Sequence, residues 1–307
     1  MPSVRFSDII ARARRIGEVR RPRIAVAGAE DQIVLEVVSD AARQGFAHPL
    51  LYGNERAILA LAKARRIPLA DCEIVDVPDA RAAARGAAEA ASSEEADVLM
   101  KGNVTTATIM KAALDPEIGI KGDGLMSHVA LLEVPGYDRM IFMSDGGIVV
   151  EPDLQQKVEI LENAVAVAKA LGIKLPKVAL ISSIEIVNSK IKSSIDAALI
   201  AKMADRGQIK GAIVDGPLAF DNAISAEAAR HKGIKSPVAG KADILIVGHA
   251  DVGNVMYKAV TYFCGKGPKT AGVIVGGKVP MVVVSRADTY DARLNSIAVA
   301  CVLGFRS

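Results

Sequence analysis

The chain has 307 residues and a formal net charge of +3, with 51% hydrophobic and 24% charged residues. This length predicts two domains, because single hydrophobic cores stop growing at about 250–300 residues. The small net charge, with no basic patch interleaved with aromatics, argues against a nucleic-acid partner. No run of about 18 apolar residues predicts a membrane span, and the first residues do not resemble a signal peptide. We therefore expect a soluble cytoplasmic protein without a membrane partner.

Cysteines and histidines are few and scattered in this sequence. The chain has three Cys and four His, and their spacing forms neither a Cys-x-x-Cys motif nor a His-Glu-x-x-His motif. We therefore expect no disulfide framework and no metal site.

The first half of the chain alternates strands and helices. Residues 6–16 form a basic amphipathic pattern that predicts a surface helix with a solvated Arg face. The alternative for this helix is a membrane or transit role. The following segments predict strands at 23–28, 49–52, 72–77 and 96–100, and helices at 32–45, 55–65 and 79–91. This alternation is typical of a parallel sheet with helices on its faces.

The alternation is interrupted near residue 127. Apolar runs at 127–134 and 139–143 flank a Pro-Gly turn, which predicts an antiparallel strand pair. A second series follows, with helices at 154–171, 195–204, 223–231 and 252–263, and strands at 177–182, 211–214, 243–247, 271–275 and 281–284. The last strand leads into a helix that runs to residue 303.

Polar side chains follow several of the predicted strands. Lys101 and Gly102 end one strand, and Thr105 opens the next helix, whose first N–H groups would attract an anion. The glycine spacings of nucleotide-binding loops are absent there. The alternative is an ordinary strand-to-helix turn in which Thr105 caps the helix.

Two further polar segments follow predicted strands. Asp215 and Asp221 belong to a segment that is either a turn with a helix cap or the lining of a cleft. Asn254, Tyr257 and Lys258 share one face of a helix, which is either a ligand face or a solvated one.

The segment directly after the last predicted strand includes the hydroxyl of Ser285, the guanidinium of Arg286 and the carboxylates of Asp288 and Asp291. Open α/β sheets hold ligands at this end of their strands. By itself Asp288 is expected to be the N-cap of the final helix, with Asp291 three residues later in a capping-box-like spacing. Together the polar strand ends suit an anionic, phosphorylated small molecule, but they do not identify a reaction.

Several motifs in order resemble the phosphate acetyltransferase/phosphate butyryltransferase family over residues 20–307. They are Lys101-Gly102 with Thr105, Leu125-Met126-Ser127-His128-Val129, Pro152-Asp153-Leu154, Val214-Asp215-Gly216-Pro217-Leu218, Asp221-Asn222-Ala223, Val238-Ala239-Gly240, Ala242-Asp243-Ile244, Gly253-Asn254 with Tyr257-Lys258, and Ser285-Arg286-Ala287-Asp288. The last motif and the segment from Asp215 to Ala223 are nearer the butyryltransferase branch. They also resemble the phosphotransacetylase domains that some bacteria fuse to an enoyl-CoA hydratase domain.

The resemblance implies a two-domain fold like that of isocitrate and isopropylmalate dehydrogenases, a three-layer α/β/α architecture with a deep inter-domain cleft. One domain would combine residues 1–138 and 285–307, and residues 139–284 would form the inserted domain. It also implies transfer of an acetyl or butyryl group between CoA and phosphate, with no tightly bound cofactor, in a homodimer or larger assembly. The alternatives are a non-catalytic protein that binds CoA or acyl phosphate, and a dehydrogenase on the same fold.

The resemblance also suggests roles for individual residues. Arg286 would hold phosphate, and Ser285 would stabilise charge in a direct transfer from a ternary complex. The expected catalytic Asp position holds Ala292, so Asp291 is the preferred base, with Asp288 and Asp221 as alternatives. The expected substrate-binding residues are Lys101, Gly102, Thr105, Ser127, His128, Asp215, Asp221, Asn254, Tyr257 and Lys258.

Overall fold

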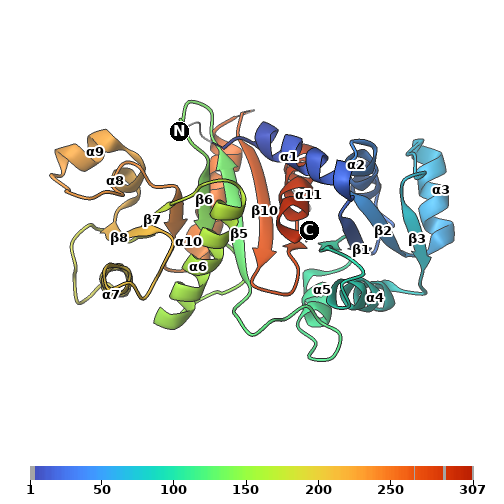
Figure 1. Cartoon of the computed structure of the whole chain (residues 1–307), viewed down its shortest axis with the longest axis horizontal. Coiled ribbons are helices and arrows are strands. Elements are labelled where there is room, and N and C mark those ends of the chain that lie inside the picture. The colour runs from blue at the N-terminus through green and yellow to red at the C-terminus, as the bar shows by residue number, and fades with distance from the viewer. Residues whose placement is uncertain (1–3, 266, 286–287, 306–307) are drawn as a thin grey trace. The chain divides into compact units, whose positions relative to one another are not determined.

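The structure, a computed structural model, describes residues 4–265, 267–285 and 288–305. These residues form two compact units, each of which combines helices and strands (Figure 1). Unit 1 comprises residues 125–270 with residues 4–5, and unit 2 comprises residues 6–124 and 271–305. The α/β class expected from the sequence is thereby confirmed. Within the described residues, no helix is both long and apolar enough to span a membrane.

Unit 2 is built on strands in the order β3-β2-β1-β4-β11-β10. All these pairings are parallel except that between β11 and β10. The strands are β1 Arg23–Ala27, β2 His48–Gly53, β3 Glu73–Asp76, β4 Val98–Lys101, β10 Lys269–Val275 and β11 Met281–Val282. The helices are α1 Phe6–Val19, α2 Gln32–Arg43, α3 Glu55–Arg65, α4 Ala80–Ser92, α5 Thr106–Ala113 and α11 Tyr290–Gly304.

Helices cover the unit 2 sheet on both faces. In Figure 1, α4 and α5 pack together on one side of the sheet, and α1, α2 and α11 pack on the other. Strands β1 and β4 are buried along almost their whole length, as is typical of a parallel sheet covered on both faces. Their carboxyl ends are therefore fixed by packing on each side.

Unit 1 has strands in the order β5-β6-β9-β7-β8. Only the pairing of β5 with β6 is antiparallel among those described. The strands are β5 Ser127–Glu133, β6 Ile141–Ser144, β7 Lys177–Ile181, β8 Ile213–Leu218 and β9 Ile244–Ile246. The helices are α6 Leu154–Ala170, α7 Lys192–Asp205, α8 Phe220–Ile224, α9 Ala226–His231 and α10 Ala250–Phe263. The predicted antiparallel pair around the Pro-Gly turn is confirmed.

The divisions between the units fall at 124/125 and 270/271, whereas the expected junctions at 138/139 and 284/285 lie later in the chain. The first division falls before β5 because β5 pairs with β6 and packs against α6. The second falls before β11 because β11 pairs with β4. Unit 1 therefore keeps β5 with β6, and unit 2 keeps β11 with β4.

Two predicted helices differ from the structure. The helix expected over 223–231 is two short helices, α8 and α9, which meet at Ser225. Ser225 has an extended backbone and caps α9 by accepting a hydrogen bond from the N–H of Ala228. The helix expected from residue 252 begins earlier, at Ala250, because the His249 side chain caps it.

Candidate functional site

The ends of β4 and β11 lie side by side in unit 2. The two strands are parallel, and Val282 of β11 is opposite Met100 of β4. The chain after β11 therefore leaves the sheet at the edge where β4 ends with Lys101. Lys101 is only 9% exposed, and its Nζ donates a 3.3 Å hydrogen bond to the Gly102 carbonyl. This edge places an ammonium group beside the start of the segment that contains Ser285.

Gly102 allows a close backbone approach at this edge. A Cβ atom at position 102 would lie 2.1 Å from the Gly28 carbonyl oxygen, which follows β1. Gly28 itself has a φ of +75°, a conformation that favours glycine. The ends of β1 and β4 can therefore touch only because both positions lack a side chain.

The segment after Lys101 is held in place by side-chain hydrogen bonds. Thr105 caps α5 by accepting a 3.1 Å hydrogen bond from the N–H of Thr108, which is one of the two alternatives for this segment. Asn103 donates a 3.2 Å hydrogen bond to the Glu30 carbonyl. The helix start is thus presented next to Lys101, but the Thr105 hydroxyl is already used as a cap.

Two hydrogen bonds join Ser285 to Asp288 after β11, and these two residues are called the Ser285 turn. The Asp288 carboxylate accepts a 2.7 Å hydrogen bond from the Ser285 N–H, and the Asp288 N–H donates to the Ser285 carbonyl at 3.1 Å. Ser285 itself is exposed. Arg286, which the sequence assigns to phosphate, lies outside the described residues.

The expectation that Asp288 caps α11 is wrong. The N-cap is Thr289, whose hydroxyl accepts a hydrogen bond from the N–H of Ala292 at 3.2 Å. Asp288 is unavailable as a cap because its carboxylate turns back to the Ser285 N–H. Asp291 lies in the first turn of α11 and is exposed, whereas Ala292 is buried.

Arg293 was not identified from the sequence, although it contacts both ends of the Ser285 turn. Its guanidinium donates to the Ser285 carbonyl at 3.1 Å and to the Asp288 carbonyl at 3.4 Å. Arg293 is only 6% exposed. The sequence does contain a signal for this role, because Arg293 is followed in α11 by mostly apolar and small side chains. A charged residue in such a helix needs a buried partner.

Tyr290 anchors the beginning of α11. Its hydroxyl donates to the Asp40 carboxylate of α2. Burial, followed by the hydrogen bond to Asp40, raises the pKa of Tyr290, so the phenol remains a donor at neutral pH. The Ser285 turn is therefore followed by a helix that is held both by Arg293 and by Tyr290.

In unit 1, Ser127 and His128 begin β5. Ser127 is fully buried, and its hydroxyl accepts a 2.9 Å hydrogen bond from the amide of Asn163. The His128 N–H donates at 3.1 Å to Asp145, a buried carboxylate that also accepts from the N–H groups of residues 147–149. Ser127 and the backbone of His128 thus contribute to the packing of this segment.

Asp215 and Asp221 do not occupy the positions expected for them. Asp215 lies within β8 rather than after it, and its carboxylate accepts a 2.8 Å hydrogen bond from the Gly216 N–H. Asp221 is not a cap, because Ala219 occupies the N-cap position of α8. Instead, Asp221 forms a 3.0 Å ion pair with Lys232. The hydrogen bond from Lys232 lowers the pKa of Asp221.

The three polar residues of α10 have different surroundings. Tyr257 donates a 3.1 Å hydrogen bond to the Thr270 hydroxyl, and the Lys258 ammonium lies 5.6 Å from the centre of the Tyr257 ring. Asn254 is exposed and belongs to the second turn of the helix rather than to its start. Across the part of the chain that the structure describes, no group of three or more His, Cys, Asp or Glu side chains could hold a metal ion.

Comparisons with known proteins identify a family for the whole chain. The model of the family described as "Phosphate acetyl/butaryl transferase" matches residues 78–301. A phosphate butyryltransferase from Clostridium beijerinckii is 44% identical over 305 residues, which cover 99% of each chain. A phosphate acetyltransferase from Thermotoga maritima is 43% identical over 280 residues, which cover 91% of this chain and 94% of the relative. Among solved structures, a branched-chain phosphotransacylase from Enterococcus faecalis V583 has a TM-score of 0.82 and 32% identity, covering 93% of this chain and 100% of that chain.

Proposed function

We infer that this chain, which belongs to the phosphate acetyl/butyryl transferase family, is an acyltransferase that moves a short acyl group between CoA and inorganic phosphate. The reaction is acyl-CoA + phosphate ⇌ acyl phosphate + CoA. The observation that supports it best is the 44% identity to a phosphate butyryltransferase across 99% of both chains. CoA and phosphate are then substrates rather than resident cofactors.

The chemistry requires a base and a charge-stabilising donor. A thiol such as that of CoA has an ordinary pKa of about 8.5, so removal of its proton produces the nucleophile. The thiolate attacks the carbonyl carbon of the acyl phosphate, and negative charge grows on the carbonyl oxygen before phosphate leaves. We propose that Ser285 donates a hydrogen bond to that oxygen, a contribution of about 3 kcal/mol in comparable sites. Transfer is direct, in a ternary complex, without an acyl-serine intermediate.

Phosphate would be held at the same edge of the unit 2 sheet. The sequence places Arg286 next to Ser285, and a guanidinium can hold phosphate through two parallel hydrogen bonds. Lys101 supplies a positive charge where β4 ends beside β11. We propose that the Arg286 guanidinium and the Lys101 ammonium together hold the phosphate.

The most suitable base in this arrangement is Asp291. Asp288 holds the Ser285 N–H and therefore has a role in shaping the turn. Asp291 is one residue from the family's expected position, which Ala292 occupies, and its carboxylate is exposed in the first turn of α11. We propose that Asp291 accepts the thiol proton.

Four of the substrate-binding residues expected in unit 1 fall into two groups. Ser127 and Tyr257 donate or accept within the protein, which favours packing roles for both. Asn254 is exposed and Lys258 is partly exposed on α10, so they are better candidates for contact with CoA. The ammonium of Lys258 suits a phosphate of that molecule.

Turnover with acyl-CoA tests the proposal directly. Thiol release from acetyl-CoA and butyryl-CoA in the presence of phosphate should be observed, and Ser285→Ala should lower kcat by about 100-fold or more. Ser7→Ala, on the exposed face of α1, is the matched control and should not change the rate. Tight CoA binding without turnover of any short acyl-CoA would favour the non-catalytic alternative. A metal-dependent change in NADH absorbance with a 2-hydroxy acid would favour the dehydrogenase.

We also propose that the protein is a homodimer. Exposed large apolar side chains occur along α10, including Val255, Tyr262 and Phe263, the last of which is 89% exposed. Exposed apolar surface of this kind favours association. Light scattering after size exclusion should give a dimer mass, and Phe263→Ser should lower it. Val19→Ser, an equally polar change at an exposed position of α1, should not.

A further inference from the structure

A cavity of about 570 Å³ lies at the carboxyl ends of β7 and β9 within unit 1. It is lined by Ser182, which directly follows β7, by His249, three residues after β9, and by the beginnings of α7 and α10. Open α/β sheets hold ligands at this end of their strands, and small-molecule sites usually measure about 300–1,000 Å³. The position and size of the cavity therefore fit a binding site.

One wall of the cavity is apolar. Phe220 is the first residue of α8, and Val252 and Met256 lie on α10. Phe220 and Val252 are exposed although they are large apolar side chains. Apolar surface inside a concave site is the usual contact for the hydrocarbon part of a ligand.

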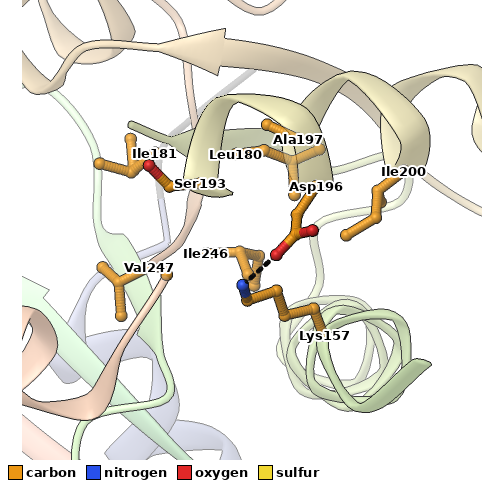
Figure 2. A pocket seen from close by; sticks show the side chains of 10 residues that line it. Lys157, Leu180, Ile181, Ser193, Asp196, Ala197, Ile200, Ile246 and Val247 are labelled. Atoms are coloured by element: carbon orange, nitrogen blue, oxygen red, sulfur yellow. Dashed lines mark hydrogen bonds and ion pairs between the residues drawn. The ribbon is translucent and has the colours of Figure 1, made fainter. Parts of the chain in front are cut away.

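Two of the residues that line the cavity, Lys157 and Lys192, carry positive charge. Figure 2 shows a smaller neighbouring pocket, which shares Lys157 and Ser193 with this cavity. In that pocket Lys157 of α6 and Asp196 of α7 point toward each other, with 2.5 Å between Nζ and Oδ2. Lys192 reaches the same Oδ2 atom at 2.6 Å. Two ammonium groups thus share a single carboxylate, which leaves one positive charge in excess. The hydrogen bond to Asp196 raises the pKa of Lys192, so its ammonium is charged at neutral pH.

Water screens the two lysines to different extents. The Lys157 side chain is 7% exposed, so water screens its charge poorly, whereas Lys192 reaches solvent. Glu151 is the carboxylate among the residues lining this cavity, and it is exposed, so water screens it more strongly. The cavity therefore retains its positive character beside Lys157.

Hydrogen-bond donors also line the cavity. The hydroxyls of Ser182 and Ser193 are 3.0 Å apart, and both residues line the cavity. Helix α7 begins at Lys192, after Ile191, whose side chain has no oxygen to cap the first N–H groups. The positive end of the dipole of this 14-residue helix therefore adds to the lysine charge.

We propose that this cavity binds a small organic anion, in which a carboxylate or phosphate head is joined to a short aliphatic chain. The head would contact Lys192, Ser193 and the start of α7. The chain would lie against Phe220, Val252 and Met256. This inference goes beyond the proposed acyl transfer, because it depends only on residues of unit 1 and not on Ser285.

Binding to the full-length protein can be measured by ligand-observed NMR titration with acetate, butyrate and hexanoate. Each added methylene should raise the affinity about threefold to fourfold, and inorganic phosphate tests the head alone. Lys192→Met should weaken butyrate binding by about 10-fold or more, because a charge-assisted hydrogen bond is lost. Lys190→Met removes an exposed lysine of the same segment and should leave the affinity unchanged. Both side chains are mostly exposed, so a thermal melt should confirm that both variants fold.

Two results would overturn the proposal. One is an affinity that does not depend on chain length, and the other is an equal affinity in the two lysine variants. Binding requires no turnover, so a protein that binds butyrate but transfers no acyl group would refute the proposed function and retain the site. Inhibition kinetics then identify the source of the ligand. Butyrate that competes with butyryl-CoA assigns the cavity to the acyl group of the substrate, and noncompetitive inhibition assigns it to a separate organic acid.

Discussion

Replacing Arg293 with methionine should lower the rate of acyl transfer more than it lowers the stability of the fold. The side chain donates to the Ser285 and Asp288 carbonyls, at 3.1 and 3.4 Å, from a position that is only 6% exposed. A hydrogen bond from a charged donor contributes about 1.5–3 kcal/mol, and water can replace part of this at a turn. We therefore expect a loss of about 2–3 kcal/mol in the free energy of unfolding, which lowers the Tm by about 4–10 °C.

The catalytic effect of this substitution should be larger than its effect on folding. A displacement of about 1 Å in a reacting group can lower a rate by about 100-fold. We expect kcat for thiol release to fall by about this factor, with little change in the KM for butyryl-CoA, since Ser285 acts mainly in the transition state. Arg293→Lys keeps the charge but lacks the fixed, planar donor geometry of the guanidinium, so it should have an intermediate kcat.

Tyr290→Phe provides the matched control for this experiment. It removes a hydrogen bond to Asp40 from the first turn of the same helix, without touching the Ser285 turn. Its Tm should fall while its kcat stays near that of the unmodified protein. The reasoning is refuted if Arg293→Met keeps kcat within about threefold, or if Tyr290→Phe loses as much activity.

Three further substitutions test other parts of the structure. Gly102→Ala would place a Cβ atom 2.1 Å from the Gly28 carbonyl oxygen, so activity and Tm should both fall sharply, whereas Gly147→Ala meets no atom within 4 Å and should be mild in the same assays. Thr289→Ala removes the cap of α11 and should cost about 1 kcal/mol in urea denaturation, and Thr289→Ser should restore most of it. Burial alone would raise the pKa of Asp196, but hydrogen bonds from two lysines lower it overall. Its folded pKa therefore lies below the unfolded value of about 3.9, and its stabilising effect is present above that value and lost as pH falls through the folded pKa. Asp196→Asn should thus cost about 3–5 kcal/mol at pH 7, and the difference should shrink at pH 3; an equal cost at both pH values would contradict this.

The alternation of strands and helices could be predicted because it depends on local hydrophobic periodicity. The antiparallel pair was also predictable, since Pro135 and Gly136 specify a turn between two apolar runs. Thr105 was identified as a possible cap because it directly precedes a helical pattern. In each case the deciding interactions lie within a few residues along the chain.

The errors arose where the sequence offers two local alternatives of similar quality and the three-dimensional contacts decide between them. Asp288 and Thr289 are both good N-cap residues, and the choice depends on the Ser285 N–H, which draws the Asp288 carboxylate away. Asp215 was placed after a strand because Gly216-Pro217 is typical of a turn. In the structure β8 continues through these residues, with a shift of register against β7 between Ala179 and Ile181.

The pairing of Lys157 with Asp196 shows the same limit for the site in unit 1. The two residues are 39 positions apart and lie on different helices. Neither belongs to a motif of the chain, and each alone resembles an ordinary charged residue on a helix. Only the packing of α6 and α7 brings them together beside a cavity.

The strand order of unit 2 also has a consequence for synthesis on the ribosome. Strand β11 lies between β4 and β10, yet it is translated after all of residues 125–270. A nascent chain can therefore complete unit 1 while the edge of β4 still lacks its neighbour, and such an open edge can pair with other chains. The unit that carries Ser285 is thus completed last. A chain that ends before residue 281 would contain all of unit 1, but the edge of β4, in the unit with the candidate active site, would be unpaired.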